Sequence, residues 1–432
     1  MQRETGEGTD RMHKRAIQAL VLTGSLLACS AAPESAGNAQ TTVPANKPVS
    51  TRVPENSPLE PNIVNVPATA GRANLPPTAP PYATVELGRF NSPFAIAVLP
   101  GGEGILVTEK AGVLKLRRPD GTVSTVAGVP QVARGGQGGL LDIAAAPGFA
   151  ADRSIYLSYA ESGPDGSALA LARATLDLNS IKCIRAPCPT GDARLTNVAV
   201  IWRSGVNGPG GQFGGNILFS PDGRYLFLSS GERQRFTPAQ DPQQALGKLF
   251  RLTLDGKAAP GNPMFAKGGV EAMTWSSGHR NSYGMAFAPD GRLWSEEMGP
   301  RGGDELNLIL PGKNYGWPIV SNGDNYSGQP IPDHPSRPDL EAPKLWWNPA
   351  ISPTGMILYS GAKFPELKGS LLITSMSDAG LTRVVLDRDK PRAVAFWDFG
   401  ARLRDIAQGT AGEIYLIEDG PNARLLQLEP KR

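Results

Sequence analysis

Six segments of this chain share one pattern, in which an apolar strand leads to a turn and then to a second strand of alternating apolar and polar residues. Three of the segments carry a Pro-Asp-Gly turn or a close variant. Their first residues are 46, 75, 68, 71 and 49 positions apart, so the loops between them must differ greatly in length. The segments are FAIAVLPGGEGILVTEK from Phe94, LLDIAAAPGFAADRSIYLSYA from Leu140, GNILFSPDGRYLFLSSGE from Gly215, YGMAFAPDGRLWSEEMG from Tyr283, TGMILYSGAKFPELKGSLLITSM from Thr354 and LRDIAQGTAGEIYLIED from Leu403.

Hardly any window of the chain shows a sustained helical period. The pattern therefore predicts an all-β fold, a six-bladed β-propeller, with active residues on loops and inner strand ends at one mouth of the central channel. This domain is expected to occupy residues 83–432. A pair of packed β-sandwiches is the alternative, although sandwiches seldom repeat one strand-turn-strand unit six times.

The N-terminus has the pattern of an export signal. Basic residues at positions 11–15 precede an uncharged run, residues 16–28, which is too short to span a bilayer but has the length of a signal-peptide core. The run ends in Leu-Leu-Ala-Cys, which resembles the lipobox of bacterial lipoproteins. Met12 is an alternative start, because the acidic residues before it are unusual in a signal peptide. We predict a lipoprotein signal peptide at residues 1–28, lipidation at Cys29, and a periplasmic-side position in the bacterial cell envelope.

Residues 29–82 are rich in Ala, Pro, Thr, Ser and Asn and predict a flexible tether, because they cannot bury enough apolar surface to offset the entropy lost on ordering. The chain has three cysteines. With Cys29 modified, Cys183 and Cys188 are left to each other, and export favours a disulfide between them. A metal site is the rival interpretation, but two thiols without a nearby histidine make a poor zinc ligand set.

The composition argues against several classes of function. Lys and Arg exceed Asp and Glu by three, a balance that gives no reason to expect a nucleic-acid partner. After removal of the signal only His279 and His334 remain, which excludes most histidine-built zinc sites and leaves little room for Ser-His-Asp catalysis.

The most distinctive stretch is residues 278–318, where GHRN is followed by MGPRGGDELNLILPGKNYGWP. Its prolines and glycines force the backbone out of regular strands and leave amides and carbonyls free for a ligand. Arg280, Arg301, Asp304 and Glu305 lie among them, and such charges are costly to bury without a counter-ion, a metal or a charged ligand. Ordinary tight turns are the alternative.

These motifs, in this order, closely resemble the glucose and sorbosone dehydrogenase family of quinoproteins, and the resemblance extends from about Phe94 to Leu428. The family implies a six-bladed propeller that oxidises sugars with pyrroloquinoline quinone (PQQ) and calcium. By the same resemblance, the backbone carbonyls of Gly299 and Pro300 would hold the calcium beside PQQ. A hard cation prefers oxygen ligands and draws electron density from the quinone.

The resemblance also implies the remaining site residues. Glu305 and Tyr315 match positions near a second, structural calcium, although Glu305 is equally a solvated turn carboxylate in its own right. PQQ carries three carboxylates, and arginine binds a carboxylate through two donors. The matching cofactor contacts are Arg280 with Asn281 in GHRN and the pair Arg402 and Arg404 in ARLRD, whose alternative is two surface arginines. Gln137 in RGGQGG matches a glutamine beside the sugar and is otherwise a loop residue.

Two positions depart from the family. Its general base is a histidine in a segment like HFGGRLVF, and the matching segment GGQFGGNILF has Gln212, which has no lone pair that titrates near neutrality. General-base catalysis contributes roughly 10²- to 10⁴-fold, so Glu232 in SSGERQRF becomes the nearest replacement. A family lysine that bonds the quinone is Ser377 here.

We therefore expect a lipid-anchored dehydrogenase that oxidises an aldose sugar or aldehyde with PQQ and calcium, and that contacts the membrane only through its lipid. The sequence names no electron acceptor. A propeller that has lost the chemistry and binds a sugar or a partner is the second hypothesis, on the evidence of Gln212 and Ser377. A calcium-dependent lactonase is the third, and it would need a cage of acidic and amide side chains in the channel.

Overall fold

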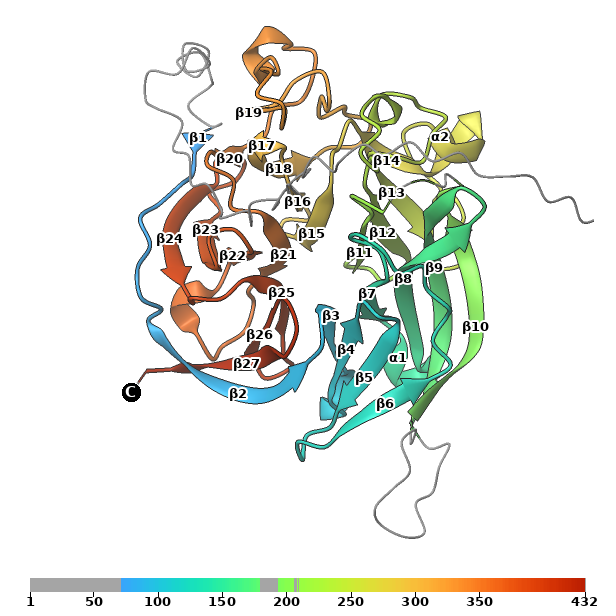
Figure 1. Cartoon of the computed structure of the whole chain (residues 1–432), viewed down its shortest axis with the longest axis vertical. Helices are drawn as coiled ribbons and strands as arrows, with labels where there is room; N and C mark the ends of the chain where they lie inside the picture. Colours follow the sequence, from blue (N-terminus) through green and yellow to red (C-terminus); the bar gives the residue numbers. More distant parts are fainter. Residues whose placement is uncertain (1–70, 179–192, 206–207, 209, 432) are drawn as a thin grey trace, which may run out of the picture. The chain divides into compact units, whose positions relative to one another are not determined.

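Almost all regular structure in the described residues is β-strand (Figure 1). The computed structural model describes residues 71–178, 193–205, 208 and 210–431, which all lie in one structural unit, Pro48–Arg432. Within these ranges the α-helices are α1 (Phe149–Asp152) and α2 (Gly269–Met273), and the 3-10 turns are η2 (Pro100–Gly102), η3 (Thr237–Ala239), η4 (Phe265–Lys267), η5 (His334–Ser336) and η6 (Pro365–Leu367). No helix of this part of the chain has the length and apolar character needed to cross a bilayer.

Each of the six repeated segments forms an antiparallel strand pair, which confirms the strand-turn-strand prediction. Every pair contains a register shift near the start of its first strand. The pairs are β3 (Pro93–Val98) with β4 (Ile105–Glu109), β7 (Leu140–Ala145) with β8 (Ser154–Gly163), β11 (Gly214–Phe219) with β12 (Tyr225–Ser230), β15 (Ser282–Phe287) with β16 (Leu293–Glu297), β21 (Pro353–Leu358) with β22 (Ser370–Ser375), and β25 (Leu403–Gln408) with β26 (Ile414–Glu418).

Further strands extend these pairs into sheets (Figure 1). The β11–β12 pair is extended by β13 (Lys248–Thr253) and β14 (Thr274–Ser277). The β15–β16 pair is extended by β18 (Asp304–Ile309), β20 (Leu345–Trp347) and β1 (Gly71–Arg72). The β21–β22 pair is extended by β23 (Gly380–Val385) and β24 (Arg392–Asp398). One eight-stranded sheet joins two pairs through the parallel strands β6 (Val123–Ala127) and β10 (Ala193–Arg203), with β5 (Val113–Arg117) and β9 (Gly166–Asp177). β17 (Arg301–Gly302) pairs with β19 (Gly323–Asp324).

The last sheet is built from both ends of the described chain. β2 (Tyr82–Phe90) runs antiparallel to β27 (Ala423–Pro430), which continues to β26 and β25 (Figure 1). Hydrogen bonds between β2 and β27 therefore join the two ends of the described chain in one sheet.

The first strands of the six pairs also contact one another in series. β3 contacts β7, β7 contacts β11, β11 contacts β15, β15 contacts β21, β21 contacts β25, and β25 contacts β3. All five residues of β4 and all six of β22 are buried, because neighbouring sheets cover both faces of the inner strands. The more distant β5 alternates between buried and partly buried positions, since one of its faces is less covered.

Two aspartates at matching positions of β25 and β7 bind the first strand of the neighbouring pair, β3 and β11 respectively. Asp405 Oδ2 accepts a hydrogen bond from the backbone nitrogen of Ile96 at 2.8 Å, and Asp142 Oδ2 accepts one from Ile217 at 2.7 Å. Both aspartates stand third in an L-x-D-I-A sequence. The repeated letters therefore encode contacts between sheets, and burial raises the pKa of Asp142 to about 6.

Hydroxyl groups on three second strands make a parallel set of contacts. Each donates to a backbone carbonyl on the first strand of the following pair. The donors and acceptors are Thr108 to Leu141 at 2.7 Å, Ser158 to Gly215 at 2.6 Å and Ser229 to Ser282 at 2.9 Å. Glu296 occupies this register position in β16, and both of its buried carboxylate oxygens lack a hydrogen-bond partner among the described residues. A carboxyl group there can donate only when it is protonated.

Candidate functional site

Gln137 and Gln212 lie in two glycine-rich loops that pack together. The backbone nitrogen of Gln212 donates to Gln137 Oε1 at 2.7 Å, and the backbone nitrogen of Gln137 donates to the Gly210 carbonyl, also at 2.7 Å. A Cβ on Gly136 would lie 2.1 Å from that carbonyl, so this approach requires glycine. Gln212 itself has φ of 44°, in the left-handed region. The structure thus brings together the residue that matches the family's sugar-side glutamine and the residue at the family's base position.

The side chain of Gln212 lies between the Glu232 carboxylate and the Arg280 guanidinium. With its nitrogen turned toward the acid, the amide donates to Glu232 Oε1, and its oxygen accepts from Arg280 Nη2 at 2.8 Å. Gln212 is only 5% exposed, so these contacts fix its orientation. The amide presents no titratable group at this position.

Glu232 is fully buried and its carboxylate is heavily occupied. Backbone nitrogens of Gln234, Arg235 and Phe236 donate to it at 3.0, 2.6 and 2.5 Å, in addition to the Gln212 amide. Burial raises the pKa of Glu232, while the backbone donors oppose that rise. With both oxygens accepting hydrogen bonds, Glu232 is better placed to hold Gln212 and its own loop than to take a proton from a substrate.

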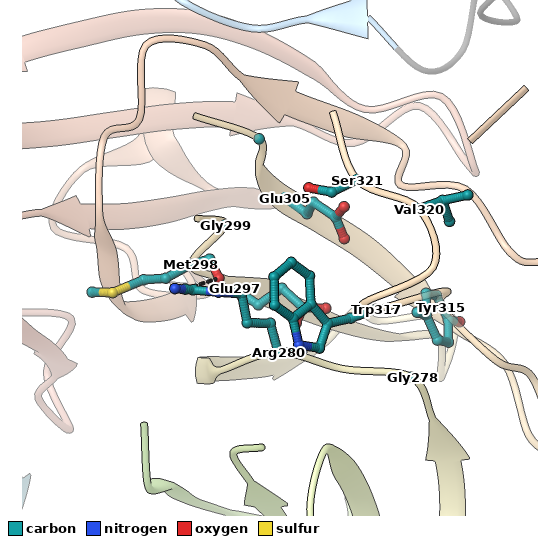
Figure 2. Close-up of a pocket in the computed structure, with 11 residues that line it drawn as sticks. Gly278, Arg280, Glu297, Met298, Gly299, Glu305, Tyr315, Trp317, Val320 and Ser321 are labelled. Atoms are coloured by element: carbon teal, nitrogen blue, oxygen red, sulfur yellow. Dashed lines mark hydrogen bonds between the residues drawn. The ribbon is translucent and has the colours of Figure 1, made fainter. Parts of the chain in front are cut away.

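Arg280 lies between polar and aromatic groups. Its Nη1 donates to the Met298 carbonyl at 2.9 Å, and its Nη2 lies 3.2 Å from the Tyr326 hydroxyl. The guanidinium carbon is 5.2 Å from the centre of the Trp317 ring, and Figure 2 shows the two side chains beside each other with the bond to Met298 dashed. The buried Nε has no hydrogen-bond partner among the described residues. Arg280 therefore carries one unsatisfied buried donor and also lines a pocket.

Glu297 holds the GHRN segment in place, a role that sequence reasoning missed. Its carboxylate accepts from His279 Nδ1 at 3.0 Å, from the backbone nitrogen of Arg280 at 2.7 Å and from that of Asn281 at 3.4 Å. Burial acts to raise the pKa of Glu297, but the His279 imidazole and the backbone donors lower it below its ordinary value. Asn281 in turn accepts from the Gly214 backbone at 3.0 Å. Two adjacent glutamates at the end of an apolar strand were the available signal.

A pocket of about 230 Å³, part of it open to solvent, lies over this segment (Figure 2). Arg280, Glu297, Gly299, Glu305 and Tyr315 are among the residues that line it. The Tyr315 hydroxyl donates to the Leu308 carbonyl at 2.5 Å and accepts from the Leu310 backbone at 2.9 Å. The Tyr315 carbonyl also accepts from His334 Nε2 at 3.2 Å, whereas Glu305 keeps one carboxylate oxygen without a hydrogen bond from the described residues.

Asp304 shapes the loop that carries the predicted carbonyl ligands. Its Oδ1 accepts from the Gly299 backbone at 2.8 Å, and its Oδ2 accepts from Ile351 at 2.6 Å and Ser352 at 2.7 Å. Burial raises the pKa of Asp304 to about 6. No hydrogen bond from residues 71–178, 193–205, 208 and 210–431 reaches the carbonyl oxygens of Gly299 and Pro300. Nor do these ranges contain three or more His, Cys, Asp or Glu side chains gathered to hold a metal.

Arg402 and Arg404 share their contacts on one side of the chain. Asp419 accepts from Arg402 Nε at 3.0 Å and lies 3.6 Å from Arg404 Nε. Their other acceptor is the Met376 sulfur, 3.1 Å from Arg402 Nη2 and 3.6 Å from Arg404 Nη1. A thioether is a weak acceptor, so it satisfies a guanidinium poorly. Asp419 and Met376 were not anticipated from the sequence.

Arg404 is the buried member of this pair, at 6% exposure, whereas Arg402 is exposed. The guanidinium carbon of Arg404 lies 4.6 Å from the Phe94 ring centre and 5.9 Å from that of Tyr283. Tyr283 follows Asn281 by two residues. The arginine pair and the GHRN segment therefore meet across Tyr283, although more than a hundred residues separate them.

Ser377 adjoins the same cluster. Its hydroxyl lies 2.5 Å from that of Ser352, and its backbone nitrogen donates to the Ile351 carbonyl at 3.0 Å. Residues 351 and 352 are the ones that Asp304 holds. The neighbour of Ser377 is Met376, so the position of the missing lysine lies beside the arginine pair. Cys29, Cys183 and Cys188 fall outside the described residues.

Comparisons with known proteins agree with this arrangement. The family model described as Glucose / Sorbosone dehydrogenase matches residues 90–427. "Aldose sugar dehydrogenase YliI" of Escherichia coli K12 is 36% identical over 365 residues, which cover 82% of this chain and 94% of that protein. The crystal structure of the soluble aldose sugar dehydrogenase (Asd) from Escherichia coli in the apo-form aligns with a TM-score of 0.74 at 34% identity, over 81% of this chain and all of that chain. A PQQ-bound aldose sugar dehydrogenase from Streptomyces coelicolor aligns with a TM-score of 0.63 at 28% identity, over 82% and 99%.

Proposed function

Because the chain belongs to the glucose/sorbosone dehydrogenase family, we propose that it is a lipid-anchored quinoprotein dehydrogenase that oxidises an aldose sugar or an aldehyde with PQQ and calcium. One observation carries the proposal. Arg280 and Arg404 are both buried, both have an Nε without a hydrogen-bond partner among the described residues, and both approach the segment around Tyr283. Buried guanidinium groups with spare donors favour a ligand that brings carboxylates.

The fold in this proposal is a six-bladed β-propeller. Six antiparallel pairs whose first strands contact one another in series, with β25 contacting β3, support that architecture. Blades of this kind leave loops at one end of the channel free to build a site. Gln137, Gln212, Arg280 and Arg404 come from four different pairs or their adjoining loops, as a site at the channel mouth requires.

The chain's residues fit the cofactor. Arg402 and Arg404 would bind carboxylates of PQQ in place of the weak Met376 sulfur contact, and Arg280 with Asn281 would bind its other side. When bound, PQQ would supply the acceptor for the two electrons and the hydrogen that leave the sugar carbon. Gln137 and Gln212 would orient the reacting hydroxyl, since both carry polar side chains held by short contacts.

Calcium would be held by the carbonyl oxygens of Gly299 and Pro300, which accept no hydrogen bond from the described residues. Oxygen donors of this kind suit a hard cation. Glu305 and the backbone of Tyr315 would serve a second, structural calcium, because both line the same pocket. Asp304 fixes the loop of the first site through the Gly299 backbone and ties it to residues 351 and 352 through two further backbone bonds.

The compartment follows from the sequence alone. We place a signal peptide at residues 1–28, a lipid on Cys29, a tether to residue 82 and the catalytic domain from residue 83 to 432, on the periplasmic side of the bacterial envelope. Oxidising conditions there favour a disulfide between Cys183 and Cys188.

A second candidate function rests on Gln212. Its amide is held between Glu232 and Arg280 and cannot titrate, and Ser377 stands where the family has a lysine. A propeller that binds a sugar or a partner without oxidising it would have these features.

Titration of the purified apoprotein with PQQ tests both functions. We expect saturable quenching of tryptophan fluorescence in calcium, and its loss in a chelator. The rate of oxidation of a panel of aldoses and aldehydes is then measured at saturating PQQ with a dye as the electron acceptor. Arg292→Ala is a suitable control, since Arg292 pairs with Asp290 in an exposed turn. Absence of PQQ binding would overturn the proposal, whereas binding without oxidation of any substrate would favour the second function.

A further inference from the structure

Lys110 is placed rigidly beside the candidate site. It follows directly after β4, and its backbone nitrogen donates to the Ser92 carbonyl at 3.0 Å. Its own carbonyl accepts from the Leu140 backbone at 3.3 Å. A Cβ on Gly139 would lie 2.0 Å from that carbonyl oxygen, so the following strand pair presses closely against Lys110. The side chain therefore starts from a backbone fixed on both sides.

The Lys110 ammonium group has few hydrogen-bond acceptors near it in the described part of the chain. Its only hydrogen bond with the described residues runs to the Gly136 carbonyl at 3.4 Å, a long contact for a group with three donors. Gly136 adjoins Gln137, so Lys110 reaches the loop that contacts Gln212. The side chain is partly buried, and its ammonium group stays accessible to a ligand.

Arg404 and Asp419 are the charged groups that act on Lys110. Burial lowers the pKa of Lys110, Arg404 lowers it further, and Asp419 works in the opposite direction. Backbone geometry also brings Lys110 near Asp419: the Ser92 carbonyl accepts from the Lys110 nitrogen, and the Ser92 nitrogen donates at 2.9 Å to the carbonyl of Gly420, the neighbour of Asp419. Asp419 already contacts Arg402 and Arg404, so a single carboxylate faces three cations.

Such a grouping is unfavourable for the protein on its own. Like charges in a partly buried place repel one another, and one carboxylate neutralises one charge. Asp405, whose pKa burial raises well above its ordinary value, also interacts with Arg404, but positive charge remains in excess among the described residues at this end of the site. A ligand with several carboxylates would relieve that repulsion, whereas a neutral sugar would not.

We propose that Lys110 is a third cationic contact of the cofactor site and binds a carboxylate of PQQ beside Arg402 and Arg404. The inference rests on the proposed function. The family has a lysine at the position of Ser377. Lys110 would supply a positive charge in its place, from a different strand pair. It acts on cofactor affinity and takes no part in proton transfer.

Equilibrium binding of PQQ, followed by tryptophan fluorescence in calcium, tests this role. Lys110→Met should weaken binding roughly 10- to 100-fold, the range for one charge-assisted hydrogen bond. Lys110→Arg should stay within about threefold of the natural protein, because the charge is kept. Lys115→Met is the matched control: Lys115 lies on β5, is also partly buried, and donates to Thr125 Oγ1 at 2.8 Å.

Two further measurements separate binding from folding. Without PQQ, Lys110→Met should unfold at the same temperature as the natural protein or slightly above it, because it removes repulsion. Added salt should weaken PQQ binding less steeply in Lys110→Met than in the natural protein.

Each contrary outcome has its own meaning. If Lys110→Met binds PQQ as tightly as Lys115→Met, the Lys110 contact is wrong while the proposed function stands. The same holds if Lys110→Arg is as weak as Lys110→Met, or if Lys110→Met unfolds well below the natural protein. If the natural protein does not bind PQQ at all, the proposed function and this inference fall together.

Discussion

The backbone nitrogen of Gln212 donates to the side-chain oxygen of Gln137 at 2.7 Å, although the two residues are 75 positions apart. The bond joins the loops that precede β11 and β7, so each glutamine helps to fix the other. The Gln212 side chain then continues to Glu232 and Arg280. Four polar residues from three strand pairs therefore form one connected group, and a change at Gln212 acts directly on it.

Gln212→His is expected to raise the rate of aldose oxidation by an order of magnitude or more at saturating PQQ. An imidazole can accept the hydroxyl proton, and Glu232 is placed to hold its other nitrogen, whereas an amide can only orient the hydroxyl. Steady-state turnover with dye acceptors measures the change, with Gln212→Asn as the control that keeps an amide. A natural protein faster than Gln212→His would show that another residue is the base.

Arg404→Ala is expected to weaken PQQ binding by roughly 1.5 to 3 kcal/mol, since it removes a charged donor that is 6% exposed. The same truncation at Arg292, which pairs with Asp290 in an exposed turn, should leave the affinity unchanged. Equilibrium titration gives both dissociation constants. Equal values for the two variants would remove Arg404 from the site.

Glu296→Gln is expected to flatten the pH dependence of stability. Burial, followed by Asp304, Glu297 and Asp405, raises the pKa of Glu296 well above its ordinary value. A folded state with a raised pKa binds more protons than the unfolded state, so its stabilising effect is present at low pH and lost as pH rises through the folded pKa. The natural protein should therefore lose stability as pH rises above the ordinary pKa of a glutamate, and Glu296→Gln should lose less.

Urea unfolding at several pH values measures this difference. The amide that Glu296→Gln introduces can donate to a carbonyl at any pH, as the hydroxyls of Thr108, Ser158 and Ser229 do at the same register position. Ser295→Ala on the same strand is a control that leaves the carboxyl group in place. Parallel pH profiles for the natural protein and Glu296→Gln would show that Glu296 does not titrate as inferred.

Cys29→Ser is expected to release the protein from the membrane fraction, because the lipid on Cys29 is its proposed hydrophobic attachment. Fractionation after a salt wash, with detection by antibody, provides the measurement. Retention of the variant in the membrane fraction would contradict the lipoprotein prediction.

Local sequence was sufficient for the strands, and it supplied the candidate site residues. Apolar runs and Pro-Asp-Gly turns predicted the six strand pairs, because strand alternation and turn geometry depend on neighbours in the chain. Both glutamines and the arginines of GHRN and ARLRD were identified from their motifs. Glu297 and Asp419 were not, since an acidic residue at a strand end is common and its meaning depends on what lies opposite.

Only the tertiary structure decided which of these residues meet. Arg404 lies over Phe94, 310 positions away, and Gln137 bonds to Gln212, because sheets from distant parts of the chain contact one another through their first strands. The same packing left Glu296 without a hydrogen-bond partner in the described part of the chain and set Lys110 beside the Gln137 loop. The sequence by itself determined the strand pairs and the types of side chain on their loops. Hydrogen bonds and close charge pairs form only over a few ångströms. The contacts of the site therefore depend on how the sheets bring those loops together, which local sequence does not specify.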